Sequence, residues 1–206
     1  MTETGYILSK DEIEQGYILA CQSVPQSDLR IEVSLPEHAA RRRVAGRISA
    51  QTKLTHDITR LDVQLDEALD YAAGQFADIS IDALSGVSRS YSFATPAQPD
   101  GQVSFFVRKV PGGVFSTAVN EQDFVGQPMQ VEGPSGNFWL RSNDAPMLLM
   151  AGGSGLAPVL ALLQDALAKG VTRSTTLLFG ARTEADLYAL DEIESIARRW
   201  QGNFRF

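Results

Sequence analysis

Cysteine, histidine and positive charge are scarce in this sequence of 206 residues. The single cysteine, Cys21, excludes a disulfide framework, a multi-cysteine zinc site and a self-contained iron–sulfur cluster. The two histidines, His38 and His56, stand far apart with no acidic residue at ligand spacing, so no metal site is expected. With 18 Lys and Arg against 25 Asp and Glu, the net charge is −7. This balance argues against nucleic acid as the main partner, because phosphate binding requires clustered cations.

Long apolar runs are also missing. The longest uncharged stretch, Ala145 to Gln164, contains three glycines and two prolines and would make a poor transmembrane helix. The first residues have neither the basic start nor the apolar core of a signal peptide. The hydrophobic fraction of 44% and the charged fraction of 21% are typical of globular proteins. The sequence therefore predicts a soluble, cytoplasmic protein without a membrane partner, and it does not determine the oligomeric state.

The hydrophobic pattern divides the chain into three zones. In the first, Leu29 to Val33 alternates between apolar and polar residues and predicts a strand. Pro36 to Arg43, with a proline and three consecutive cations, is interpreted as a linker. From Val44 to about Arg141 the pattern has a period of two, interrupted by turn signals, which predicts a small antiparallel barrel or sandwich. One short helix is expected within it, from Val114 to about Asn120.

The third zone follows Pro146 and has the order of a parallel α/β domain. Met147–Ala151 and Thr175–Phe179 are continuous apolar runs that predict strands buried on both faces. Helices are expected from Pro158 to Lys169, with Gly170 as its C-terminal cap, and from Asp191 to Trp200. Asn203–Phe206 resembles the beginning of a third strand, so the α/β domain is predicted to be incomplete.

A glycine loop, Gly152–Gly155, lies between the first of these strands and the helix that follows. That position lets backbone N–H groups and the helix N-terminus face an anionic ligand. The loop lacks the Gly-Lys-Ser/Thr of a P-loop, and Pro158 stands where a dinucleotide fingerprint has its third glycine. The next strand is followed by Gly180-Ala-Arg182, without an acid to hold a ribose. By spacing alone, the loop fits nucleotide binding and a plain tight β–α turn equally well.

Two segments of the second zone carry groups suited to a phosphate-bearing aromatic ligand. Arg89 offers a planar guanidinium, Tyr91 an aromatic plane and Ser92 a hydroxyl. One strand later, Gly112 and Gly113 would let a ligand approach the backbone at the start of the short helix. Taken one at a time, these features also fit an exposed arginine, a core tyrosine and a hairpin turn.

Together and in this order, Arg-x-Tyr-Ser, Pro-Gly-Gly-x-x-Ser and Gly-Gly-Ser-Gly-x-x-Pro resemble the ferredoxin–NADP reductase superfamily. In particular, they resemble the reductase components of bacterial ring-hydroxylating oxygenases and multicomponent monooxygenases. The resemblance implies a six-stranded antiparallel β-barrel that binds FAD over residues 41–142. It implies an incomplete parallel α/β domain for the nicotinamide nucleotide over residues 143–206. Residues 1–40 would be a remnant of a plant-type ferredoxin domain with a linker.

The resemblance also implies roles for individual residues. Arg89 would contact the FAD pyrophosphate, while Tyr91 would stack on the isoalloxazine and Ser92 would hydrogen-bond near flavin N5, which makes these two the candidate catalytic residues. Arg182 and Asp186 would contact the adenosine end of the nicotinamide nucleotide. Glu184 and Asp186 would repel a 2′-phosphate, which favours NADH over NADPH. The other candidate cofactor-binding residues are Ser90, Val107, Arg108, Gly112, Gly113, Val114, Ser116, Gly152, Gly153, Ser154, Gly155 and Pro158.

Two departures from the family pattern affect the expected function. Cys21 matches the fourth cluster ligand of a plant-type ferredoxin, but the other three cysteines are absent, so no [2Fe–2S] cluster is expected in this chain. The family's Cys-Gly-Pro motif would lie beyond Phe206, so the chain resembles a longer reductase cut at both ends. The expected function is electron transfer from NADH through FAD to an iron–sulfur centre, ferredoxin or oxygenase partner. The alternatives are an FAD-binding fragment without turnover and a domain that has lost its flavin.

Overall fold

The structure is a computed structural model that describes residues 8–19, 23–30 and 39–206. The chain forms two compact units, Met1–Glu37 and His38–Phe206. In the first unit, the helix α1 (Lys10–Glu14) begins with a capping box, in which the Ser9 hydroxyl accepts from the Glu12 N–H and the Glu12 carboxylate accepts from the Ser9 N–H. Leu29 and Arg30 belong to no strand, and the rest of the strand predicted there lies outside the described residues, as does Cys21.

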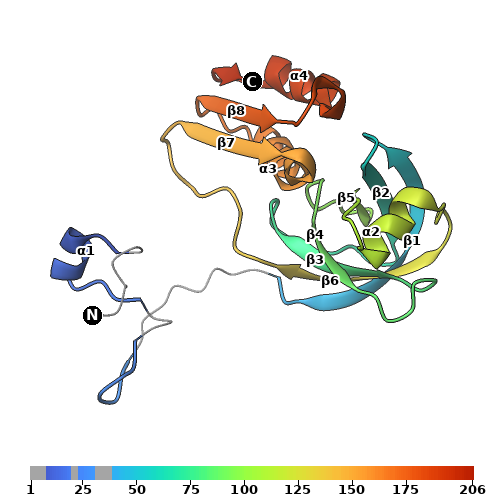
Figure 1. The fold of residues 1–206 in the computed structure, drawn as a ribbon. Helices are drawn as coiled ribbons and strands as arrows, with labels where there is room; N and C mark the ends of the chain where they lie inside the picture. Colours follow the sequence, from blue (N-terminus) through green and yellow to red (C-terminus); the bar gives the residue numbers. More distant parts are fainter. Residues whose placement is uncertain (1–7, 20–22, 31–38) are drawn as a thin grey trace. The chain divides into compact units, whose positions relative to one another are not determined.

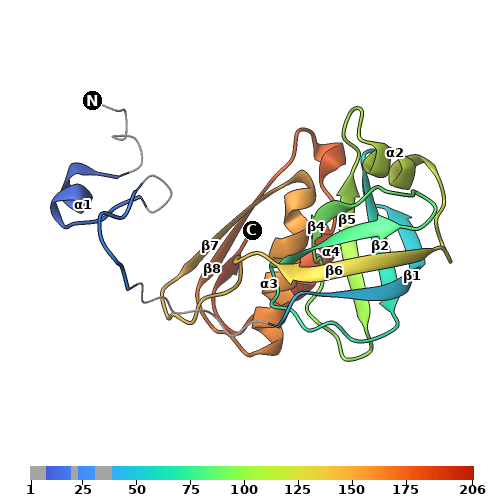
Figure 2. The same cartoon turned by 90° about the horizontal axis from the view of Figure 1, so that it is seen from below.

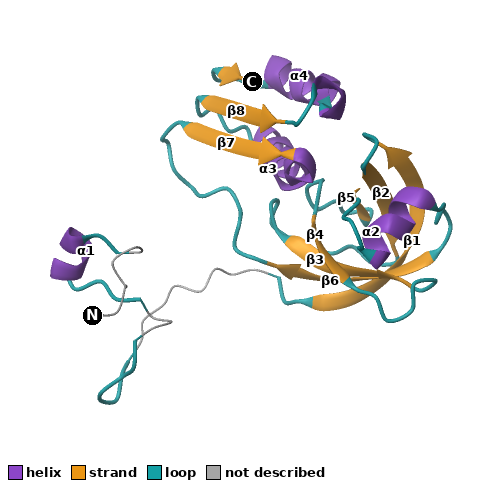
Figure 3. Ribbon diagram, viewed as in Figure 1, coloured by secondary structure: helices purple, strands orange, loops and turns teal. Residues whose placement is uncertain are grey.

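Six antiparallel strands form the first part of the second unit, which confirms the predicted barrel (Figures 1 and 3). Their order in the sheet is β4-β3-β6-β1-β2-β5, and a bridge between Phe93 and Phe105 joins the two outer strands. The strands are β1 (Arg42–Lys53), β2 (Ile58–Leu65), β3 (Phe76–Ile81), β4 (Arg89–Ser92), β5 (Gln102–Arg108) and β6 (Pro128–Ser135).

The interpretation of Pro36 to Arg43 as a linker is wrong at its C-terminal end. Arg42 and Arg43 are the first residues of β1, and Arg43 lies directly opposite Glu132 of β6. The Arg43 guanidinium donates to the Glu132 carboxylate at 2.7 Å. Cross-strand pairs of opposite charge stabilise a sheet, which explains why consecutive cations are tolerated in this strand. Of the remainder, residues 36–38 lie outside the described part of the chain.

The barrel core follows from the period-two pattern. Leu61, Val63 and Leu65 on β2 point inward and are buried, while polar residues lie between them. The predicted short helix is confirmed as α2 (Val114–Glu121), which buries Phe115 and Val119 against the same core. Apolar burial of this kind is the main stabilising contribution to such a fold.

The second part of this unit is a parallel sheet in the order β7-β8-β9, as predicted. Figures 1 and 2 show α3 between this sheet and the barrel. One core cluster accordingly contains Ile58 and Phe106 of the barrel together with Leu156 and Leu160 of α3. Gly170 follows α3 in the left-handed conformation, with φ +68°, as expected for a C-terminal cap. The elements are β7 (Met147–Gly152), α3 (Leu156–Ala168), β8 (Thr175–Gly180), α4 (Leu190–Arg199) and β9 (Phe204–Arg205).

The prediction that β7 and β8 are buried on both faces is wrong for one face of the sheet. Leu148 and Met150 are 62% and 70% exposed, and Leu178 is also exposed. The reason is that α3 and α4 both contribute to the core on the other face, where Leu177 and Ile193 are buried. No helix within the described ranges is long and apolar enough to cross a bilayer.

Candidate functional site

The strand β4 and the start of α3 line one cavity of about 440 Å³. Its barrel side is formed by Arg89–Ser92 together with Phe106, Arg108 and Val110. Ser154, Gly155 and Pro158 line its other side, with Ala157 of α3. The structure therefore brings together two motifs that are more than sixty residues apart in the sequence.

The side chains of β4 differ in how firmly they are held. Arg89 is exposed, and its guanidinium donates to the carbonyl of Ser88 at 2.6 Å. The Ser90 hydroxyl donates to the Asp78 carboxylate at 2.5 Å. Tyr91 is half-buried, with its ring centroid 5.6 Å from that of Phe115. Burial raises the pKa of Tyr91 to about 12, so its hydroxyl is neutral at physiological pH.

The segment from Arg108 to Ser116 forms a turn that leads into α2. Gly112 has φ +74° and open space around its missing side chain, while Gly113 is the N-terminal cap of the helix. A Cβ on Gly113 would lie 2.5 Å from the Ser116 hydroxyl, which accepts from the Val110 N–H at 3.1 Å. Val114 is exposed at this turn, whereas the side chain of Val107 is buried in the barrel core.

The glycine loop connects β7 to α3 through a 3₁₀ turn at Gly153–Gly155. Gly153 has φ +52°, and a Cβ there would lie 3.3 Å from the Arg108 guanidinium. The Tyr188 hydroxyl donates to the Gly153 carbonyl at 2.8 Å and so fixes the loop against the second core cluster. Burial raises the pKa of Tyr188, which keeps this donor protonated. The loop thus places backbone at a helix N-terminus, a position that favours anions.

A second cavity of about 290 Å³ lies beside the glycine loop. Arg108 lines both cavities. The sequence-predicted residues in the second cavity are Arg108, Gly152, Gly153, Arg182 and Asp186, and they are joined by Asp57 and Ile58 from the barrel and by Gly180 and Ala181. A third cavity, of about 450 Å³, contains none of the predicted site residues.

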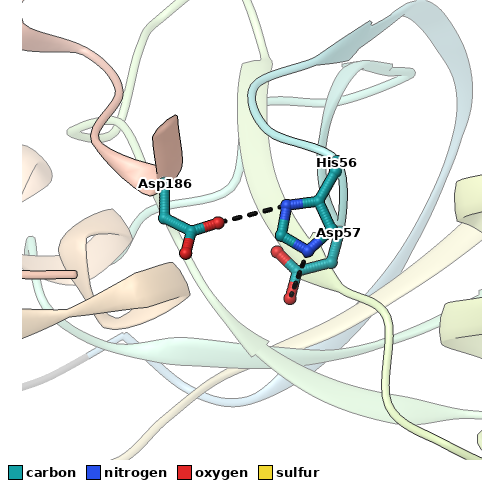
Figure 4. A group of neighbouring side chains, drawn as sticks. All are labelled: His56, Asp57 and Asp186. Carbon is teal, nitrogen blue, oxygen red and sulfur yellow. Dashed lines mark ion pairs between the residues drawn. The ribbon is translucent and has the colours of Figure 1, made fainter. Parts of the chain in front are cut away.

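Charged residues from both parts of the unit meet in the second cavity. One oxygen of Asp57, Oδ2, accepts from Arg108 Nε at 3.0 Å and from Arg182 Nη2 at 2.9 Å. Figure 4 shows His56 between Asp57 and Asp186, with its Nδ1 3.1 Å from Asp186 Oδ1. Burial of Asp57 opposes its ionisation, but hydrogen bonds from Arg108 and Thr55 and the nearby positive charge outweigh it and lower the pKa.

Folding places two acids beside His56, although the sequence shows no acidic residue at ligand spacing. Nitrogen and oxygen atoms of His56, Asp57 and Asp186 lie within 4.8 Å of one another, close enough to hold a metal ion. Two guanidinium groups already neutralise these carboxylates, so we interpret the group as an ion-pair network. Sequence reasoning missed Asp57 because its partner Arg182 lies 125 residues further along the chain.

The two parts of this unit match two known domain families. The oxidoreductase FAD-binding domain matches residues 45–139, and the oxidoreductase NAD-binding domain matches residues 149–206. The chain belongs to the ferredoxin–NADP reductase superfamily. The FAD-binding match contains β4 and the turn before α2, and the NAD-binding match contains the glycine loop and Arg182.

Members of this superfamily that resemble the chain include reductase components of oxygenases. The xylene/toluene monooxygenase electron transfer component of Pseudomonas putida is 41% identical over 99% of this chain and 59% of its own length. The toluate 1,2-dioxygenase electron transfer component of the same species is 35% identical over 93% and 58%. The chain therefore spans less than two thirds of the length of these curated relatives.

Solved structures of the superfamily show the same fold. The cytochrome P450 reductase GcoB of Amycolatopsis aligns with a TM-score of 0.76 and 31% identity, over 96% of this chain and 62% of that one. The ferredoxin reductase in carbazole 1,9a-dioxygenase aligns with a TM-score of 0.71 and 31% identity, over 86% and 55%. The two domain matches support FAD and a nicotinamide nucleotide as the cofactors.

Proposed function

We propose that this chain is the flavin- and nicotinamide-binding part of an electron-transfer reductase. It takes electrons from NADH through FAD and passes them to an iron–sulfur centre, a ferredoxin or an oxygenase. The observation that supports this most directly is the cavity of about 440 Å³ lined by both β4 and the start of α3. A flavin bound on the barrel side and a nicotinamide bound at the glycine loop would meet in it. The proposal divides the chain at residues 1–40, 41–142 and 143–206, with the first segment a remnant of a ferredoxin domain.

The residues around the cavities fit the two cofactors chemically. Arg89 supplies an exposed guanidinium for a pyrophosphate, and Gly112, which has open space around it, leaves the backbone accessible just before the N-terminus of α2. Tyr91 supplies a half-buried aromatic plane for a flavin ring. The glycine loop at the start of α3 offers a second anion-binding backbone for the nicotinamide nucleotide.

When bound, FAD supplies a two-electron acceptor for hydride and a one-electron donor for the partner, so the chemistry belongs to the cofactor. The chain's own residues bind, orient and exclude water. Tyr91 stays neutral because its pKa is about 12, and it presents its ring without adding charge. Ser92, half-buried beside it, provides a hydroxyl for a hydrogen bond near flavin N5. Holding both cofactors in one cavity supplies the proximity that hydride transfer requires.

NADH is the proposed electron donor in preference to NADPH. The loop after β8 carries Glu184 and Asp186, whose negative charges oppose a 2′-phosphate. The proposed electron acceptor is a partner protein. The organic substrate would bind to that oxygenase, so the residues of this chain do not determine it.

A second candidate is an FAD-binding fragment without turnover. The exposed apolar face of the β7–β8 sheet favours it. Leu148 and Met150 on this face are exposed, so helices cover the sheet of the nucleotide-binding half on one face only. In this reading the barrel holds FAD as proposed, while the nicotinamide is held too loosely for hydride transfer.

The test is to load the 206-residue chain with FAD, desalt it and record its visible absorption spectrum. Retained flavin supports the barrel as an FAD site, and a colourless protein refutes both candidates. Steady-state oxidation of NADH with ferricyanide as acceptor then separates them. Saturable turnover supports the reductase and refutes the fragment without turnover, whereas retained flavin without turnover does the reverse.

A further inference from the structure

Arg182 follows β8, at the edge of the sheet where nucleotide-binding α/β folds contact the adenosine ribose. β7 and β8 are parallel neighbours, and Gly152 at the end of one is in register with Gly180 at the end of the other. In nucleotide-binding α/β folds, an acid after the second strand binds the ribose 2′-hydroxyl, whereas an arginine nearby accommodates a 2′-phosphate. Judged by residue type alone, Arg182 would therefore favour the phosphorylated nucleotide.

The structure shows that this arginine is already paired. Its Nη2 donates to Asp57 Oδ2 at 2.9 Å, and its Nε lies 3.6 Å from Asp186 Oδ2. Asp57 comes from the β1–β2 turn of the barrel, so the pair joins the two parts of the unit. The two carboxylates are well buried, with side chains 14% and 11% exposed, while Arg182 is 59% exposed.

Asp57 is held in place by more than this one contact. Its Oδ1 accepts from the Thr55 hydroxyl at 3.0 Å, and its Oδ2 accepts from Arg108 at 3.0 Å. A carboxylate with several donors stays ionised and ordered. The second cavity thus contains two arginines, Arg108 and Arg182, and two aspartates, Asp57 and Asp186. Their formal charges cancel, which leaves no unpaired cation for an additional phosphate.

We propose that Asp57 is a specificity-determining residue, which pairs with Arg182 across the two parts of the unit and thereby makes the adenosine end of the site select the unphosphorylated nucleotide. The inference rests on the proposed function and deepens it. It moves the main determinant of the NADH preference from the acids of the β8 loop to a carboxylate of the FAD-binding barrel. Without the Asp57 charge, the Nη2 of Arg182 would lose its carboxylate partner and could donate to a 2′-phosphate, while its Nε still faces Asp186.

The experiment measures binding of the oxidised nucleotides, so it requires no turnover. NAD⁺ and NADP⁺ are titrated by calorimetry into the FAD-loaded chain, and the ratio of the Kd for NADP⁺ to the Kd for NAD⁺ is compared between variants. Asp57→Asn should lower this ratio about tenfold, the order of one charge-assisted hydrogen bond to phosphate. Asp66→Asn is the matched control, because it makes the same charge change directly after the other end of β2, which begins next to Asp57.

The double variant Asp57→Asn/Arg182→Gln tests whether the effect acts through the arginine, and it should return the ratio to the wild-type value. An unchanged ratio in Asp57→Asn, with NAD⁺ still bound, overturns the inference while leaving the proposed function intact. A wild-type chain that retains FAD but binds neither nucleotide overturns the nucleotide site itself, and the inference with it.

Arg182→Gln alone keeps the inference testable even if Asp57→Asn does not fold. Because the Arg182 guanidinium is already paired with Asp57, this variant should change the ratio of the Kd for NADP⁺ to the Kd for NAD⁺ by less than twofold. A selective loss of NADP⁺ binding of about tenfold would mean that Arg182 is free to bind the phosphate, and would refute the inference.

Discussion

Replacing Asn120 by alanine should destabilise the protein by about 3 kcal/mol, because its buried amide connects α2 to three strands. The amide Nδ2 donates to the carbonyls of Val107 at 3.0 Å and Ser116 at 2.9 Å. Its Oδ1 accepts from the Thr59 hydroxyl at 2.8 Å and from Lys53 Nζ at 3.0 Å.

The magnitude follows from what the alanine variant leaves behind. Thr59 is fully buried, so its hydroxyl would lose its acceptor without gaining water, and the Val107 carbonyl would lose a donor in the same region. A buried polar group left unpaired costs about 1–3 kcal/mol, and two such groups give the value stated.

Urea denaturation followed by far-UV circular dichroism measures this loss as a decrease of about 1 M in the midpoint. Asn143→Ala is the matched control, since Asn143 is exposed and accepts only from the Ala145 N–H at 2.6 Å. A loss below about 1 kcal/mol for Asn120→Ala would refute the reasoning, because it would mean that the network contributes no more than an ordinary hydrogen bond.

Three further predictions concern the proposed site and the ion pairs. Arg89→Ala should weaken FAD binding about tenfold or more by removing a charge-assisted contact, measured by flavin fluorescence, while Arg198→Ala on α4 should have no effect. Gly113→Ala should lower both FAD affinity and thermal stability, because the new Cβ would lie 2.5 Å from the Ser116 hydroxyl; an unchanged melting temperature would contradict this. Hydrogen bonds from arginines hold the pKa of Glu132 below its usual value of 4.5, so its stabilisation is present above that pH and lost as the pH falls further. Glu132→Gln should therefore flatten the acid side of the stability curve in melts between pH 3 and 6, and a curve parallel to wild type would refute the assignment.

The sequence was sufficient for features that depend on local periodicity. Alternating residues such as Leu61, Val63 and Leu65 predict strands because one face of a pleat must be buried. The glycine loop predicts a β–α turn because glycine tolerates the φ of +52° found at Gly153. These local rules, joined by the family resemblance, predict the barrel, the parallel sheet and most of the residues that line the first cavity, but not Phe106, Val110 or Ala157.

Features that depend on contacts between residues far apart in the chain could not be predicted from the sequence. The runs at Met147 and Thr175 indicate buried strands, but an apolar run does not reveal which faces the helices will cover. Asp57 is an ordinary aspartate in the sequence, and its function in the site emerges only when folding brings Arg182 beside it. The sequence predicts a linker at the basic segment before Val44, because nothing in the local sequence shows that Glu132, on a strand far along the chain, will pair with Arg43.

The core cluster that combines Ile58 and Phe106 of the barrel with Leu156 and Leu160 of α3 has a thermodynamic consequence. Each part completes the apolar interior of the other, so separating them would expose side chains that are buried in the joined form. The two parts are therefore coupled in unfolding and should melt in one cooperative transition instead of two.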